Sequence, residues 1–141
     1  MINSRSIEDL IPSMQILCKA HIAACAAVGI DLLVTSTYRD AESQSALYAQ
    51  GRTKPGKIVT NARAGESYHN FQVAYDVVPI RNGKPVWDIN DPSWAIIGTL
   101  GEKCGLDWAG RWIKFKEFAH FQKPGLTLAK LHDPQFITSL T

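Results

Sequence analysis

Two histidines and one aspartate in this sequence, His69, Asp76 and His120, have the chemistry of metal ligands. Asp76 lies in a stretch that is otherwise apolar on both alternating faces, which is typical of a buried strand. A carboxylate left unpaired there would be costly, so Asp76 must meet a cation, hydrogen-bond donors or a metal. Pairing with an arginine, Arg39 or Arg63, is the main alternative to a metal site.

His69 precedes Asp76 by seven residues, and on one straight strand two residues at that spacing would face opposite sides. We therefore expect residues 70–72 to form a turn that brings the two side chains back together. Ala74 is small and leaves room beside Asp76 for a bulky group.

Glu117 precedes His120 by three residues, where the chain must enter a second apolar strand. Two neutral imidazoles and one carboxylate form a normal catalytic zinc set, which leaves the fourth tetrahedral position for water. A second carboxylate that is not a ligand can then take the proton of that water. Spacing alone leaves this site open, because the sequence has neither an HExxH motif nor a cysteine-rich finger.

The elements that must position these residues follow from the hydrophobic pattern. Helices are expected at residues 12–28, 40–50, 92–104 and 127–132, and strands at residues 30–37, 73–80, 84–87, 106–108 and 118–122. The first strand reads as buried, and a turn at Asn82-Gly83 predicts a hairpin. Residues 52–67 form a long loop, which in a compact domain is usually functional. The fold class expected is α+β, with a small antiparallel sheet carrying the zinc site and helices packed mainly on one side.

Composition limits the class of protein. The chain has 141 residues, 45% of them hydrophobic and 20% charged, which predicts one ordered domain. A net charge of +2 gives no reason to expect nucleic acid as a partner. No stretch approaches the roughly 20 apolar residues of a membrane span, and no signal peptide is recognisable, so we expect synthesis in the cytosol. Cys18, Cys25 and Cys104 are expected to be buried thiols, and Cys104 is a weak candidate for a nucleophile.

The pattern Ser67-x-His69-x(6)-Asp76, followed by Glu117-x-x-His120, resembles the signature of the zinc D-alanyl-D-alanine metallopeptidase group, peptidase family M15. Within this family the chain is most similar to phage and prophage endolysins that act as L-alanyl-D-glutamate peptidases. Further matching stretches lie at residues 34–39, 44–53, 55–62 and 112–121, so that the resemblance spans roughly residues 12–123.

The resemblance implies a role for each matching residue. Zinc would be bound by His69, Asp76 and His120, and Glu117 would be the general base that later protonates the leaving amine. Arg39 would hold a substrate carboxylate or polarise the scissile carbonyl. Three further residues are expected at the substrate cleft, namely Gln44, Ser67 and Trp112.

Two positions depart from the family pattern. Gln72 stands where the family usually has glycine, so a left-handed backbone there would be strained, or the turn would differ. Glu117 stands where this endolysin branch often has aspartate, which weakens the expectation of bond specificity more than that of catalysis.

The function expected is a zinc-dependent peptidoglycan peptidase that hydrolyses the L-Ala-D-Glu bond of the stem peptide during cell lysis. The alternatives are a D-Ala-D-Ala carboxypeptidase of the same family and a non-catalytic, zinc-stabilised binding domain. We expect residues 1–141 to be a single catalytic domain without a separate wall-binding domain, acting as a monomer. It would wait in the cytoplasm of the bacterial host, without inserting into the membrane, until a holin permeabilises that membrane.

Overall fold

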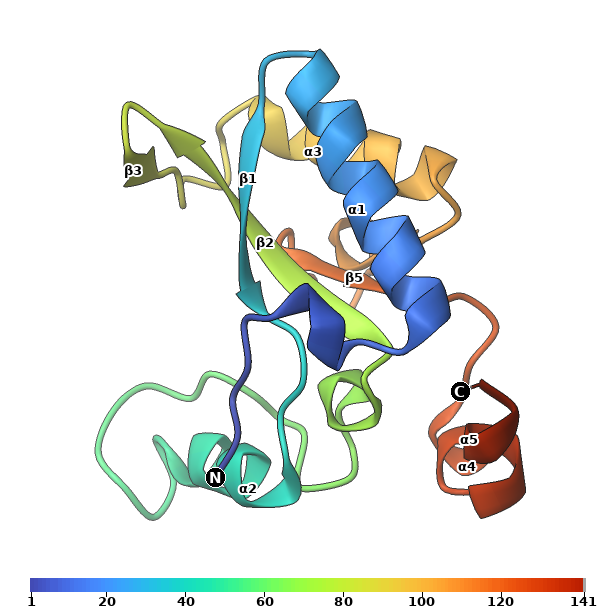
Figure 1. Ribbon diagram of the computed structural model, residues 1–141. Helices are drawn as coiled ribbons and strands as arrows, with labels where there is room; N and C mark the ends of the chain where they lie inside the picture. The colour runs from blue at the N-terminus through green and yellow to red at the C-terminus, as the bar shows by residue number, and fades with distance from the viewer. Residues whose placement is uncertain (141) are drawn as a thin grey trace.

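The computed structural model describes residues 1–140 and has the α+β architecture expected from the sequence (Figure 1). The helices are α1 (Pro12–Ala27), α2 (Ala41–Ala49), α3 (Ser93–Lys103), α4 (Leu128–Leu131) and α5 (Pro134–Leu140), with short 3-10 turns η1 (Ile7–Asp9), η2 (Tyr68–Phe71) and η3 (Ala109–Arg111). The strands are β1 (Asp31–Ser36), β2 (Ala74–Arg81), β3 (Lys84–Pro85), β4 (Asp107–Trp108) and β5 (His120–Gln122). All strand pairs are antiparallel, in the order β1-β2-β5-β4, and β3 pairs with β2.

Helices α1 and α3 pack together over the sheet and enclose the hydrophobic core (Figure 1). Tyr75 of β2 is completely buried and hydrogen-bonds to His21 of α1, with 2.7 Å between the phenol oxygen and Nδ1. Because adjacent strand residues point to opposite faces, Asp76 points away from these two helices. The candidate ligands therefore lie on the face of the sheet that α1 and α3 leave open.

His21 is part of the core and is completely buried. Its Nε2 lies 2.8 Å from the carbonyl oxygen of Ile97, which can only accept, so Nε2 carries the proton and Nδ1 accepts from Tyr75. Burial lowers the pKa of the imidazole, which keeps it neutral inside the core. Of the three cysteine thiols, all free, Cys18 and Cys25 are buried, whereas Cys104 is partly exposed.

Strand β1 differs from the expectation that the first strand is buried. It lies at the edge of the sheet and pairs only with β2 along its length, so it is not buried on both faces. Leu33, for example, is 43% exposed. A run of apolar residues does not distinguish an edge strand from a central one, because strand order depends on tertiary pairing.

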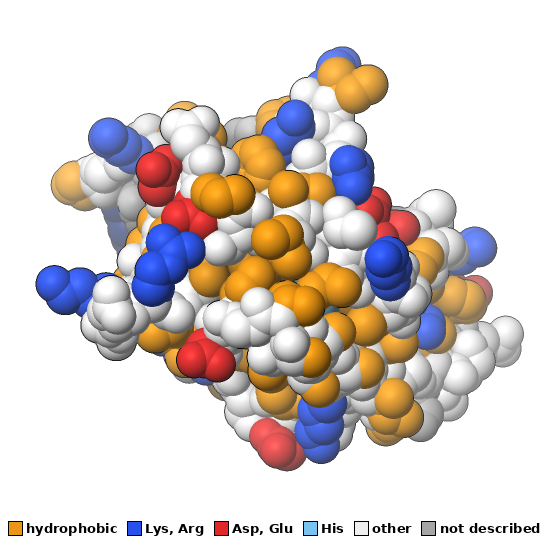
Figure 2. All heavy atoms as spheres, turned by 90° about the horizontal axis from the view of Figure 1, so that it is seen from above, with side chains coloured by type: hydrophobic (Ala, Val, Ile, Leu, Met, Phe, Trp, Pro, Cys, Tyr) orange, Lys and Arg blue, Asp and Glu red, His pale blue; other side chains and the backbone are white. Residues whose placement is uncertain are grey.

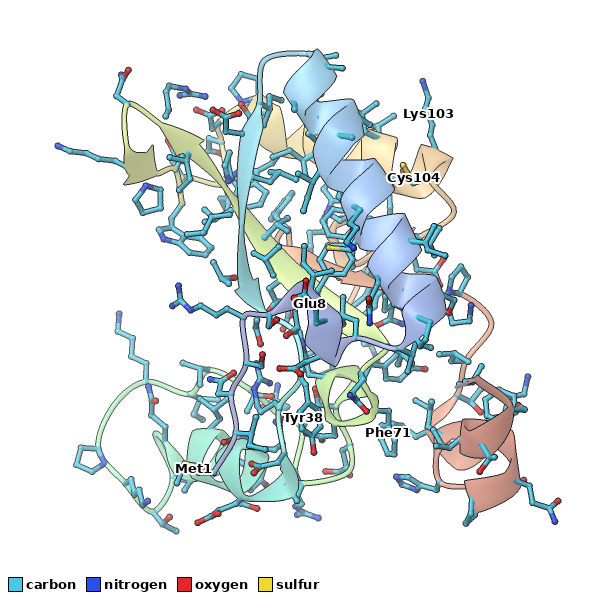
Figure 3. All side chains as sticks on the ribbon, viewed as in Figure 1. Met1, Glu8, Tyr38, Phe71, Lys103 and Cys104 are labelled. Carbon is cyan, nitrogen blue, oxygen red and sulfur yellow. The ribbon has the colours of Figure 1, made fainter. Side chains whose placement is uncertain are left out.

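The chain after β5 forms two short helices where one was expected, and they pack next to the candidate site. Tyr68 of η2 donates from its hydroxyl to the carbonyl of Leu126 (2.7 Å), and His132 lies 2.6 Å from the carbonyl oxygen of Gly65. Figure 3 shows the side chain of Phe71 directed from η2 toward α4 and α5, and its ring centroid lies 5.6 Å from that of His132. These contacts hold η2 in place from the C-terminal side.

The end of the molecule uppermost in Figure 1 presents a different surface. Figure 2 looks onto this end and shows apolar side chains gathered over the middle of the face, with lysines, arginines and acidic residues around them. In the described residues 1–140, no helix is long and apolar enough to cross a membrane.

Candidate active site

The three candidate ligands come from η2 and from two adjacent strands. Asp76 and His120 are direct partners in the pairing of β2 with β5, so their side chains lie next to each other. His69 enters from η2, which immediately precedes β2. The tertiary structure therefore joins two stretches that lie 44 residues apart in the sequence.

The turn between His69 and Asp76 forms as expected, and it passes through Gln72. This residue has φ 63° and ψ 26°, the left-handed conformation that a glycine would adopt without strain. Two hydrogen bonds of Gln72 offset some of the strain of this conformation. Its side-chain Nε2 donates to the backbone carbonyl of Asp9 (2.7 Å), and its backbone carbonyl accepts from the amide of Ile11 (3.1 Å). Glutamine here ties the turn to the start of α1.

The potential ligand atoms of the cluster converge. Asp76 Oδ1 lies 3.2 Å from His69 Nε2 and 3.1 Å from His120 Nδ1, and one ligand atom from each residue lies within 4.8 Å of the others. Within residues 1–140 the ion-pair partners of Asp76 are the two histidines, and no arginine forms an ion pair with it. The alternative of an Asp76–arginine pair is thus not what the structure shows.

The outer nitrogen of each imidazole determines which nitrogen faces the cluster. His69 Nδ1 donates to the backbone carbonyl of Thr37 (2.9 Å), and His120 Nε2 donates to Gln122 Oε1 (2.9 Å). The remaining nitrogens, His69 Nε2 and His120 Nδ1, therefore present lone pairs to a carboxylate oxygen. Three acceptors in one place repel each other unless a cation lies between them, so this donor set fits a metal ion.

The electrostatics of the cluster agree with this conclusion. Burial opposes ionisation of Asp76, but the two imidazoles outweigh it and hold the pKa of the carboxyl well below its usual range. Burial likewise disfavours the charged form of His120. The hydrogen bond that a protonated Nδ1 donates to Asp76, and the charge of that carboxylate, nevertheless raise the pKa of the imidazole. The cluster thus attracts positive charge.

Glu117 lies at the mouth of the cluster. Its Oε2 is 3.8 Å from His120 Nδ1, and its side chain is 55% exposed. The backbone before it turns through Phe115, which has φ 54° and is 69% exposed, and the amide of Glu117 donates to the carbonyl of Ala109 (3.3 Å). The carboxylate of Glu117 can therefore reach a group bound at the cluster, although it is not one of the three candidate ligands.

Arg39 follows β1 and faces the same cleft. Its guanidinium donates from Nη1 to Gln44 Oε1 (3.0 Å) and from Nη2 to Ser36 Oγ (3.1 Å), while its buried Nε–H has no hydrogen-bond partner within residues 1–140. Burial lowers the pKa of Arg39, and the charges of Asp76 and Glu117 act against this shift. The guanidinium is therefore oriented by neutral oxygens. Each of its terminal nitrogens has a second N–H, which can donate to an anionic or carbonyl oxygen.

The three residues expected at the cleft occupy different places. Trp112 and Ser67 line a cleft of about 520 Å³ together with the cluster, and the ring of Trp112 lies 5.7 Å from that of His120. Ser67 also caps η2, since its hydroxyl accepts from the amide of His69 (3.3 Å). Gln44 is completely buried behind Arg39 and donates to the carbonyl of Ala62 (2.8 Å), so it orients Arg39 and the loop rather than facing the cleft.

Gln122 is a residue of the site that sequence reasoning missed. Its amide oxygen accepts from His120 and so determines which imidazole nitrogen faces the cluster. A signal was present, because His120 and Gln122 are two residues apart on a predicted strand and must share a face. The contribution of the Thr37 carbonyl leaves no such signal, because any residue type supplies a carbonyl.

Comparison with known proteins identifies related peptidases. A family model described as D-alanyl-D-alanine carboxypeptidase matches residues 60–123. The chain is 37% identical over 122 residues to the peptidoglycan L-alanyl-D-glutamate endopeptidase CwlK of Bacillus subtilis (strain 168), covering 81% of this chain and 73% of the relative.

Solved structures share the fold at lower identity. The L-Ala D-Glu endopeptidase ChiX of Serratia marcescens matches with a TM-score of 0.60 at 19% identity, covering 86% of this chain and 88% of ChiX. The D,D-pentapeptidase VanY from a VanB-type vancomycin resistance cassette, solved in complex with Zn(II), matches with a TM-score of 0.60 at 14% identity, covering 88% of this chain and 84% of VanY.

A partly buried carboxylate between two imidazoles, with a free glutamate at the mouth of the cleft, defines a metallopeptidase type of site. Because the chain is also 37% identical to CwlK over 122 residues, it belongs to peptidase family M15. It is a peptidoglycan peptidase of that family.

Proposed function

We propose that this protein is a zinc-dependent endopeptidase that hydrolyses the L-Ala-D-Glu bond of the peptidoglycan stem peptide. The observation that carries the proposal is the convergence of three lone pairs from His69, Asp76 and His120 beside the free carboxylate of Glu117. The choice of bond is supported by the identity to CwlK, which is named for that bond.

In this proposal His69, Asp76 and His120 hold the zinc. The bound ion supplies Lewis-acid chemistry and lowers the pKa of water. Thr37 and Gln122 keep the two imidazoles in the tautomers that can bind it.

Glu117 is the general base and then the general acid. It takes a proton from the attacking water as the new carbon–oxygen bond forms at the scissile carbonyl. It returns that proton to the nitrogen of the leaving residue as the carbon–nitrogen bond breaks, so the carboxylate is regenerated. Its exposure and its position 3.8 Å from His120 allow both transfers.

Arg39 stabilises negative charge on the substrate, either the carbonyl oxygen as it gains charge or a carboxylate of the stem peptide. Gln44 and Ser36 keep the guanidinium in one orientation, so that little reorganisation is needed when substrate binds. Trp112 and Ser67 contribute to substrate binding from the wall of the same cleft.

The products of a disaccharide pentapeptide test the choice of bond. We expect mass spectrometry to find a disaccharide that retains L-Ala and a free tetrapeptide that begins with D-Glu. Loss of only the terminal D-Ala would instead establish the D-Ala-D-Ala carboxypeptidase, the activity for which the matching family model is described.

We further propose that the protein acts as an endolysin of a phage or prophage. The motifs shared with that branch of the family, from residues 34–39 to residues 112–121, support this role. In this setting it is a monomer whose residues 1–141 form one catalytic domain, and it reaches the cell wall once a holin has permeabilised the membrane. The single hydrophobic core to which β2, β5 and the surrounding helices contribute is consistent with one domain.

The contact between Gln122 and His120 leads to a prediction for metal affinity. We expect Gln122→Leu to weaken zinc binding about 10–100-fold, because the imidazole loses the acceptor that selects its tautomer. Competition with a chromophoric chelator measures this affinity. Gln122→Glu keeps an acceptor and should retain most of the affinity, and Gln135→Leu, at an exposed glutamine of α5, should change nothing. Equal affinity in Gln122→Leu and the unmodified protein would contradict the role of Gln122.

A further inference from the structure

A second cavity adjoins the candidate active site on the other side of Glu117. Its volume is about 600 Å³, similar to that of the cleft beside Arg39, and both cavities are lined by Asp76 and Glu117. The second cavity is walled mainly by apolar and aromatic side chains, Trp87, Ile89, Trp94 and Phe118, with Lys116 at its rim. A substrate that crosses the metal cluster would therefore extend into both cavities.

The aromatic wall is exposed although it is apolar. Trp87 is 54% exposed and Ile89 is 60% exposed, on the segment that joins β3 to α3. Behind them Trp94 is only 2% exposed, and its ring stacks against that of Trp87 with 6.4 Å between centroids and 27° between planes. Large apolar side chains left in water beside a catalytic group are typical of a binding surface.

This segment is held firmly in place. Arg81 forms two hydrogen bonds with Asp91, of 2.9 and 3.1 Å, and a third with Ser93 Oγ (3.1 Å). The indole nitrogen of Trp94 donates to the carbonyl of Asp88 (3.0 Å). Because these hydrogen bonds hold the segment in place without a ligand, binding to it costs less conformational entropy.

We propose that Trp87 and Ile89 bind the saccharide to which the stem peptide is attached. The inference rests on the proposed function, because hydrolysis of the L-Ala-D-Glu bond places that sugar close to the cluster. Only the alanine and the lactyl group separate the sugar ring from this bond. The second cavity is then the subsite for the uncharged, amino-terminal part of the substrate.

The distribution of charge favours this orientation of the substrate. On the carboxyl-terminal side of the bond the stem peptide carries carboxylates, beginning with that of D-Glu. The cationic side chain of Arg39 lines the first cleft and not the second. The carboxylates therefore fit the first cleft, and the neutral saccharide fits the aromatic wall of the second.

The chemistry of the ligand also fits this wall. One face of a pyranose ring presents several C–H groups, which pack flat against an indole, while the hydroxyl groups around the ring stay in water. An exposed indole such as Trp87 supplies this flat surface, and its stacking on Trp94 holds it in one orientation. Lys116 at the rim can donate a hydrogen bond to a hydroxyl or acetamido oxygen.

Two substrates that differ only in the saccharide test the proposal. One is a disaccharide tetrapeptide, and the other is the same tetrapeptide with an N-acetyl group in place of the sugar. For the unmodified protein we expect kcat/KM to be higher with the saccharide. For Trp87→Ala we expect that preference to fall roughly tenfold, because one central aromatic contact is removed. Ile89→Ser, which changes a second exposed side chain of the same wall, should reduce the preference in the same direction.

Two controls accompany these variants. Trp87→Phe keeps an aromatic ring and should retain part of the preference, and Ile113→Ala, at a residue that is 99% exposed and lines neither cavity, should retain all of it. Equal loss of activity on both substrates in Trp87→Ala and Ile89→Ser, or no loss on either, would overturn the assignment.

A binding measurement separates this inference from the choice of scissile bond. In the Glu117→Gln protein, which should not turn over the substrate, saturation-transfer NMR should detect contacts to the saccharide protons, and adding Trp87→Ala should abolish them. If the saccharide contacts are present but the unmodified protein cleaves a different bond, only the proposed function is refuted. If the unmodified protein cleaves the L-Ala-D-Glu bond but the saccharide contacts are absent, only the saccharide subsite is refuted.

Discussion

Glu117→Gln is expected to lower the rate of peptidoglycan hydrolysis by about 10²–10⁴-fold, because the amide cannot accept and return the proton of the attacking water. The variant should keep its fold and its metal, since the side chain is 55% exposed and the three acceptors that face the metal position come from other residues. Glu117→Ala should behave in the same way. Release of soluble fragments from purified peptidoglycan measures the rate, and elemental analysis measures the metal.

A glutamate away from the cleft provides the matched control. Glu42→Gln, on α2 and 69% exposed, makes the same chemical change and should leave hydrolysis unaltered. Undiminished hydrolysis by Glu117→Gln would remove Glu117 from the mechanism. If neither the unmodified protein nor Glu117→Gln cleaves peptidoglycan, and both bind it equally well, the protein is instead the non-catalytic zinc-stabilised binding domain.

His69→Ala is expected to lose both metal and activity. His69 is 3% exposed and supplies one of the three ligand atoms, and within residues 1–140 only Asp76 and His120 belong to the cluster with it. Removing it leaves two ligands, too few for a structural or catalytic zinc site. We expect elemental analysis to fall from about one zinc per chain to almost none, and hydrolysis to fall with it.

The control for His69 must remove a histidine without touching the cluster. His132 is exposed and hydrogen-bonds to the carbonyl of Gly65, so His132→Ala should retain the metal even if the loop around Gly65 loosens. Circular dichroism of His69→Ala distinguishes loss of the ligand from loss of the fold. Full metal content in a folded His69→Ala protein would exclude this residue as a ligand.

The order of elements was predictable from local patterns, and the residues of the cluster were predictable from the family resemblance. Proline at the first turn of α1 and glycine after its end delimit that helix, and alternation along β2 placed Asp76 on the face opposite Tyr75. The need to compensate a carboxylate on an apolar strand left a metal or an arginine as the partner of Asp76, and the family resemblance indicated His69 and His120.

Other features depend on which segments meet. The edge position of β1, the second C-terminal helix and the burial of Gln44 behind Arg39 follow from tertiary packing, and hydrophobic periodicity does not encode strand order or the neighbours of a polar side chain.

The sequence by itself determined the identity of the chemical groups: two imidazoles, a carboxylate that could not remain unpaired, a free glutamate and an arginine. Only the tertiary structure decided how they act together. It selected the tautomers of His69 and His120 through Thr37 and Gln122, and it placed a second cavity beside Glu117. The physical reason is that local preferences come from neighbours in the chain, whereas hydrogen-bond partners and cavities come from residues that packing brings together across long separations in sequence.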